Sequence, residues 1–120
     1  MKKREIKQGD IYMVNLDDGI DSEEHGSRPC ICISCNSLTK NRKNVIIAPI
    51  TSSKTKKDMV NHYELSKDKY PEFLYDVNTV LLECIRDISK SRLERYLFHI
   101  EEQDLDEILQ KIMYDFIELP

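Results

Sequence analysis

A chain of 120 residues, of which 40% are hydrophobic and 33% charged, has the length of one globular domain and can bury about two thirds of its unfolded surface. The sparse glycine and proline content excludes a low-complexity or disordered chain, and no apolar run approaches the roughly 18 residues that a membrane span requires. A formal net charge of −4 excludes a uniformly basic surface, and we expect one cytoplasmic domain over residues 1–120 without membrane contact.

Short strands followed by one helix are predicted along the chain. Six segments have the length and the β-branched or aromatic composition of strands: residues 10–16, 29–34, 44–50, 60–65, 79–85 and 95–100. Most are apolar on both faces, which favours a small, strongly coiled sheet with another element packed outside it. Residues 101–119 supply that element, because their apolar residues recur at helical spacing and predict an amphipathic C-terminal helix. The expected fold class is mainly β, with long irregular stretches only at residues 17–28 and 66–78.

Three cysteines follow the first long loop. The segment PCICISC places Cys30, Cys32 and Cys35 in a run of strand composition. Side chains alternate across a strand, so Cys30 and Cys32 share one face and Cys35 takes the other. Three sulfurs in that arrangement do not converge on one ion, and we interpret the thiols as small hydrophobic residues of the core rather than as a zinc site. We expect no metal and no other cofactor.

Charge is segregated along the chain although its sum is acidic. Residues 39–57 carry six basic side chains and no acidic one, whereas residues 101–118 carry seven acidic side chains and one lysine. The basic residues are Lys40, Arg42, Lys43, Lys54, Lys56 and Lys57. This segment is either a solvated loop surface or a basic face for a phosphate-bearing partner, and charge alone does not separate the two.

Two polar positions adjoin apolar strands where a site could form. Arg28 stands where the long loop returns to the sheet, and its guanidinium offers a planar fork of donors suited to phosphate. Thr51 ends an apolar strand and begins a series of hydroxyls with Ser52 and Ser53. Each feature alone is typical of a surface ion pair or a turn, but together they suit a phosphodiester.

Four sequence blocks resemble, in order and spacing, the signature blocks of the MazF/PemK family of toxins from bacterial toxin–antitoxin pairs. The blocks are GDIYMVNL, SEEHGSRPCICIS, IAPITSS and VLLECIRDISKSRL, and the resemblance runs from about Lys7 to the C-terminal helix. It implies an SH3-like barrel of the CcdB/PemK type with an appended helix and a homodimeric assembly. It also implies a ribosome-independent endoribonuclease, an mRNA interferase, that a cognate antitoxin inhibits.

The resemblance assigns roles residue by residue. The catalytic arginine of the family falls on Arg28 and its catalytic threonine on Thr51. The implied reaction needs no metal: the 2′-hydroxyl of the RNA attacks the adjacent phosphorus and leaves a 2′,3′-cyclic phosphate and a 5′-hydroxyl end. The candidates for contact with RNA are Ser22, Glu23, His25, Ser52, Ser53, Glu83 and Arg86. For Glu83 and Arg86 the alternative is an ion pair that ties a strand to a turn.

Arginine is a poor proton acceptor near neutral pH, so attack by a 2′-hydroxyl needs another group to take the proton. His25 and Glu23 are the two candidates in the long loop, and the alternative for His25 is an exposed, solvated side chain without a catalytic role.

The sequence departs from the family pattern at four positions. Glycine is common at Asp21, glutamine at Glu24, glycine at His25 and glutamine at Cys84. These departures concern the choice of RNA sequence more than the catalytic pair.

The expected partners are single-stranded RNA, messenger RNA foremost, and a cognate antitoxin with an acidic segment that folds on binding. We expect DNA contact only through the antitoxin complex. Two other functions stay open. One is a gyrase poison like the related CcdB toxins, although those act through a C-terminal tryptophan motif and this chain has no tryptophan. The other is a catalytically silent RNA-binding relative.

Overall fold

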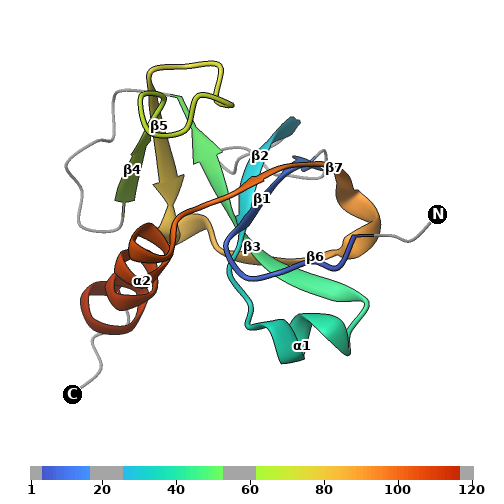
Figure 1. The fold of residues 1–120 in the computed structure, drawn as a ribbon. Helices are drawn as coiled ribbons and strands as arrows, with labels where there is room; N and C mark the ends of the chain where they lie inside the picture. The colour runs from blue at the N-terminus through green and yellow to red at the C-terminus, as the bar shows by residue number, and fades with distance from the viewer. Residues whose placement is uncertain (1–3, 17–25, 53–61, 117–120) are drawn as a thin grey trace.

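Antiparallel strands make up most of the computed structural model, which describes residues 4–16, 26–52 and 62–116 (Figure 1). Within these residues the strands are β1 (Asp10–Asn15), β2 (Ser27–Cys32), β3 (Asn44–Thr51), β4 (His62–Ser66), β5 (Val77–Leu81), β6 (Arg86–Ser89) and β7 (Leu93–His99). The helices are α1 (Asn36–Lys40) and α2 (Glu102–Gln110), and shorter helical turns form η1 (Leu82–Cys84), η2 (Lys90–Arg92) and η3 (Lys111–Phe116). The predicted mainly β fold with a C-terminal helix is confirmed.

The described strands form a seven-stranded sheet in the order β4-β5-β3-β2-β1-β7, and β6 pairs with the first half of β3. Two register shifts interrupt the pairing of β1 with β7, and such irregularities increase the local twist of a sheet. Helix α2 lies near β4, whereas α1 lies at the other end of the molecule beside the start of β3 (Figure 1). None of the described helices has the length and apolar composition needed to cross a membrane.

Strand β3 loses a neighbour on one edge and changes its neighbour on the other. On one edge it pairs with β2 as far as Cys30 opposite Pro49, and on the other edge it pairs first with β6 and then with β5, beginning at Ile50 opposite Val80. Proline has no N–H to donate to a ladder, and both strands carry one here, at Pro29 and Pro49. The β2–β3 ladder therefore ends at the prolines, and the two strands separate beyond them.

The two faces of the sheet carry two hydrophobic cores, as expected from strands that are apolar on both faces. One core contains Ile31 of β2 and receives Leu105 and Ile108 from α2. The other contains Cys30 and Cys32, the neighbours of Ile31 along β2. The strand alternation predicted from the sequence is thus confirmed for these three residues.

The cysteines divide into buried and exposed positions. Cys30 and Cys32 are fully buried, and burial, with a smaller contribution from Asp10, raises the pKa of the Cys32 thiol to about 12. Cys35 is exposed at the residue preceding α1, so the prediction that it fills the core is wrong. The reason is that β2 ends at Cys32, and the chain has already left the sheet when it reaches Cys35.

The strand predicted over residues 79–85 is divided in the structure. β5 ends at Leu81, η1 turns the chain, and β6 then runs along the first half of β3 with Arg86 opposite Ile47. The two halves of the predicted strand therefore pair with opposite ends of β3. The sequence does not reveal this division, because the segment is continuously apolar. The C-terminal helix begins as expected, but after Gln110 it continues as a π-helical turn, η3.

Candidate active site

Arg28 and Thr51 stand on the two sides of the opening where β2 and β3 separate. Arg28 is a half-buried residue of β2 that faces Val14 of β1, and Thr51 is the last residue of β3 and faces Thr79 of β5. The β2–β3 ladder ends where Cys30 pairs with Pro49, which is two residues from Arg28 along β2 and two residues from Thr51 along β3. The two predicted catalytic residues therefore flank the same end of that ladder, where their strands no longer pair with each other.

A pocket of about 670 Å³ opens at this point, a size within the roughly 300 to 1,000 Å³ of ligand pockets. Arg28 and Pro29 of β2 form one part of its wall, and Ile50 and Ser52 form another. β7 contributes Arg95, Tyr96 and Leu97, and the segment between β4 and β5 contributes Glu72, Phe73, Leu74 and Tyr75. Four stretches that are distant in sequence thus meet around Arg28.

The charge of this pocket is unevenly distributed. The two arginines, Arg28 and Arg95, come from β2 and β7, which are the strands on either side of β1. The acidic Glu72 comes from the segment before β5, on the wall that also carries Phe73, Leu74 and Tyr75. An anion therefore fits the β2–β7 side, and an apolar group fits the other.

Among the described residues that the sequence analysis singled out, Arg28 and Ser52 line this pocket, whereas Thr51, Glu83 and Arg86 do not. The Oε2 atom of Glu83 lies 2.9 Å from Nε2 of His62, a buried residue of β4. Within the described residues, the other carboxylate oxygen of Glu83 and the hydroxyl of Thr79, which faces Thr51, are buried and have no hydrogen-bond partner. Ser22, Glu23, His25 and Ser53 lie outside the described residues.

The sequence analysis did not single out several of the residues that line the pocket. Arg95 was read only as the start of a strand, and Tyr75 only as part of an irregular stretch. Neither position belongs to the four sequence blocks, so no motif pointed to them. A tyrosine in a long loop between rigid strands was the one available signal.

The basic segment is only partly described. Arg42 donates to Asp87 at the start of β6 at 2.8 Å, so this arginine is paired on the surface. Lys54, Lys56 and Lys57 lie outside the described residues. Among the residues that are described, no three His, Cys, Asp or Glu side chains are grouped so that they could hold a metal ion.

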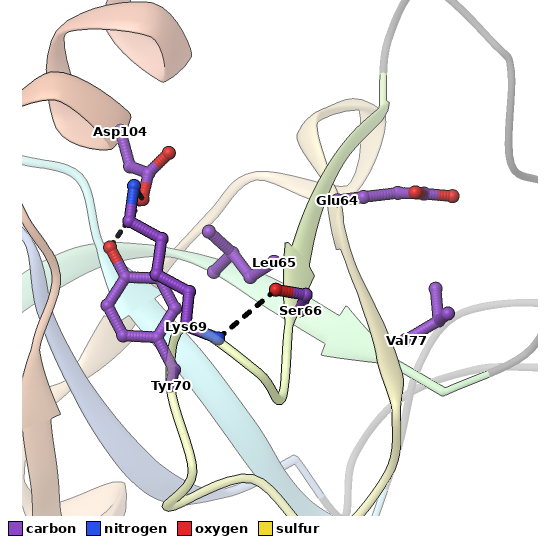
Figure 2. Close-up of a pocket in the computed structure, with 7 residues that line it drawn as sticks. All are labelled: Glu64, Leu65, Ser66, Lys69, Tyr70, Val77 and Asp104. Atoms are coloured by element: carbon purple, nitrogen blue, oxygen red, sulfur yellow. Dashed lines mark hydrogen bonds and ion pairs between the residues drawn. The ribbon is translucent and has the colours of Figure 1, made fainter.

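A second, smaller hollow of about 170 Å³ lies between β4, the following turn and α2 (Figure 2). The carboxylate of Asp104 accepts hydrogen bonds from the hydroxyls of Tyr63 and Tyr70, and Nζ of Lys69 lies 2.9 Å from it. Burial alone would raise the pKa of the Asp104 carboxyl, but these donors outweigh burial and the pKa lies below its usual value. Burial and the bond to Asp104 raise the pKa of Tyr70 to about 12. These groups satisfy one another, which indicates a structural junction rather than a reactive centre.

A family model and a curated relative that match this chain point to the same family. The model of the family described as PemK-like, MazF-like toxin of type II toxin-antitoxin system matches residues 7–115. A curated relative, Endoribonuclease MazF of Staphylococcus saprophyticus, is 32% identical over 103 residues, which cover 86% of this chain and 84% of the relative.

Solved structures share the fold. MazF (Form-I) of Deinococcus radiodurans superposes with a TM-score of 0.78 at 19% identity, covering 98% of this chain and 100% of that one. An endoribonuclease from a Mycobacterial species, solved in complex with its cognate antitoxin, superposes with a TM-score of 0.75 at 16% identity, covering 95% and 96% of the two chains.

Proposed function

Because the chain belongs to the PemK-like, MazF-like toxin family of type II toxin–antitoxin systems, we propose that it cleaves single-stranded RNA with Arg28 and Thr51 as its catalytic pair. Endoribonuclease activity as such follows from the family membership. The observation that supports this pair is the pocket beside the end of the β2–β3 ladder, which is lined by Arg28 and by Ile50 and Ser52, the two neighbours of Thr51 in the chain.

The proposed reaction uses the RNA's own 2′-hydroxyl as the nucleophile. The 2′-oxygen loses its proton and bonds to the adjacent phosphorus, while the bond from phosphorus to the 5′-oxygen breaks and that oxygen gains a proton. The products are a 2′,3′-cyclic phosphate and a 5′-hydroxyl end, with no net change in protons. Arg28 neutralises the charge that accumulates on the pentavalent phosphorus, and the hydroxyl of Thr51 donates to a non-bridging oxygen. Donors aimed at developing charge are worth about 10²- to 10³-fold each, so the pair supplies much of the acceleration without a metal ion.

The substrate is a single RNA strand cut at a preferred sequence, and DNA resists because it lacks the nucleophile. A cognate antitoxin neutralises the enzyme by laying an acidic segment over the arginine-lined side of the pocket. That segment and the RNA backbone carry the same charge, so both favour Arg28 and Arg95, and each excludes the other.

A cleavage assay without divalent metal tests the proposal. Purified protein, a long single-stranded RNA and an excess of a chelator should yield fragments with cyclic phosphate and 5′-hydroxyl ends, and a 2′-deoxy substitution at the cut should block cleavage there. Arg28→Ala and Thr51→Ala should each lower the cleavage rate by about 10²-fold or more while circular dichroism stays that of the wild type. Near wild-type cleavage by either folded variant would contradict the assignment, and RNA binding without any cleavage would indicate a silent relative.

A further inference from the structure

Two residues that are consecutive in the sequence place exposed, largely apolar side chains at the wall of the Arg28 pocket. Leu74 is 82% exposed and Tyr75 is 58% exposed, and both line that pocket. Large apolar residues seldom face water in adjacent positions without a partner, and Tyr in particular is suited to contacts that have one apolar and one polar side. The two side chains together form an exposed apolar surface at the pocket wall that is suited to a ligand.

Buried neighbours on both sides fix the backbone of the segment that carries Leu74 and Tyr75. Phe73, the preceding residue, is 4% exposed and packs edge-on against Phe98 with ring centroids 5.1 Å apart. On the other side, the buried amide of Asn78 donates to the backbone carbonyl of Tyr75 at 2.8 Å and to that of Leu65 at 3.2 Å. Tyr75 is thus anchored on both sides, so the conformational entropy lost when a ligand binds to its ring is small.

The two tyrosines of the pocket differ in the availability of their rings. The guanidinium of Arg4 lies 3.6 Å from the ring centroid of Tyr96, and the Tyr12 ring meets it edge-on at 5.6 Å. For Tyr75 the described residues provide no such ring or cation contact. Its ring is therefore the aromatic surface of this pocket that a ligand can use.

We propose that Tyr75, with Leu74 beside it, is a stacking platform for one nucleobase of the RNA next to the phosphate held at Arg28. The proposal rests on the proposed function, since it concerns the substrate of the same site. Proteins that bind single-stranded nucleic acid pair a positively charged track for the backbone with aromatic side chains for the bases. The pocket has this division, because Arg28 and Arg95 are on the side of β2 and β7 whereas Tyr75 and Leu74 are on the other.

The acidic Glu72 strengthens the choice of a base over a phosphate. It belongs to the same wall as Tyr75 and would repel a phosphate there, while a neutral base is compatible with it. Every base has an apolar face, so the platform contributes affinity at this position, and the choice of base falls to polar groups such as Ser52 and Asn78, which line the same pocket.

Substitutions at position 75 test the platform by cleavage kinetics. Tyr75→Ala should raise the RNA concentration needed for half-maximal cleavage by about 5- to 100-fold, as expected for the loss of one stacked base, with a smaller change in kcat. Tyr75→Phe should retain wild-type behaviour, and Tyr75→Leu should resemble Tyr75→Ala because it keeps apolar area but not the ring. Tyr114→Ala is the matched control, since Tyr114 is 57% exposed and lies in η3, away from the pocket.

Fluorescence provides a readout that does not depend on cleavage. The chain has no tryptophan, so Tyr75→Trp introduces a single reporter. In a Thr51→Ala background, for which we expect cleavage to be about 10²-fold slower, addition of single-stranded RNA should quench this tryptophan by stacking before the RNA is cut. A tryptophan placed at Tyr114 in the same background should show no quenching.

The outcomes separate this inference from the proposed function. If the wild type fails to cut RNA, the proposed function is wrong, and quenching at position 75 still reports whether a base stacks there. If the wild type cuts RNA and Tyr75→Ala cuts with unchanged kinetics, the platform is wrong and the catalytic assignment stands. If Tyr75→Ala instead converts a dimer to a monomer in light scattering, or weakens only antitoxin binding, the occupant is a protein and the inference is overturned.

Discussion

Arg28 owes its place at the pocket to the residues around it in β2 and β3. It lies inside β2, held by the pairing with β1, two residues beyond the last position at which β2 pairs with β3. Pro29 and Pro49 end the ladder because neither has an N–H to offer. A charged side chain thus sits on a strand that is fixed on one side and open on the other, which suits a group that must meet a phosphate in one orientation.

Also at the residue scale, mutagenesis can identify the group that accepts the proton of the RNA 2′-hydroxyl. If His25 accepts the proton of the 2′-hydroxyl, His25→Ala should lower the cleavage rate by about 10²-fold or more and remove the acidic limb near about pH 6 from the rate profile, because an imidazole loses its proton in that range. The measurement is kcat against pH for the wild type and the variant. An unchanged profile for His25→Ala, together with a large loss for Glu23→Gln, would transfer the role to Glu23.

The sequence pointed to Arg28 and Thr51 as the proposed catalytic pair, but it did not predict the pocket that Arg28 lines. Arg28 and Thr51 are recognisable because each stands at a fixed offset from an apolar strand within a family block. Tyr75 and Arg95 reach the pocket only through the way β7 and the segment before β5 approach β2, and such tertiary contacts leave no local pattern. The pairing of Glu83 with His62 was missed for the same reason, since the sequence suggested Arg86 as the partner of that carboxylate.

At the scale of elements, α2 is joined to the sheet by one buried carboxylate as well as by apolar packing. Asp104 accepts from Tyr63 of β4 and from Tyr70 of the following turn, so three elements meet at its two oxygens. Acidic residues in the first turn of a helix favour the helix dipole, and Glu102 and Asp104 occupy that turn in α2. The structure adds that Asp104 also has these specific partners, a role that helical periodicity does not reveal.

Asp104→Asn should therefore lower the free energy of unfolding by about 2 kcal/mol at neutral pH, because hydrogen bonds to a charged acceptor are lost. The pKa of Asp104 is lowered in the folded state, so its stabilising contribution is complete above the unfolded value of about 3.9 and is lost as pH falls through the folded value. Urea unfolding at about pH 7 and about pH 3 should show a difference between variant and wild type that shrinks at the lower pH.

The control is Glu102→Gln, which removes an exposed carboxylate from the first turn of the same helix and should cost less than Asp104→Asn. Equal stability of Asp104→Asn and the wild type at neutral pH would show that the Asp104 junction contributes nothing net to the free energy of unfolding.

The elements themselves were predicted well where the periodicity of apolar residues was strong. The exception is the division into β5, η1 and β6, because both halves are apolar and only their pairing with opposite ends of β3 separates them.

At the scale of the whole molecule, the pocket is smaller than the substrate. A volume of about 670 Å³ accommodates only a short piece of RNA, whereas recognition of a sequence requires contacts with several nucleotides. A second copy related by a two-fold axis would extend the binding surface, and closed two-fold dimers are the commonest assemblies of soluble proteins.

We accordingly predict that the protein is a homodimer, with a mass in light scattering of twice the 14.2 kDa of the chain at micromolar concentration. Its antitoxin should displace RNA from that dimer without separating the subunits, which the same measurement follows after the inhibitor is added. A monomeric mass at a concentration where RNA is still cut would contradict the prediction.

The pairing of the first strand with the last has a consequence for the cell that makes this toxin. β1 is among the earliest segments to be synthesised, yet one of its two neighbours is β7, which also brings Arg95 to the pocket. A nascent chain that has not yet released β7 from the ribosome therefore lacks part of its binding site, however well its earlier strands have folded. Each copy therefore completes this pocket only after β7 has left the ribosome.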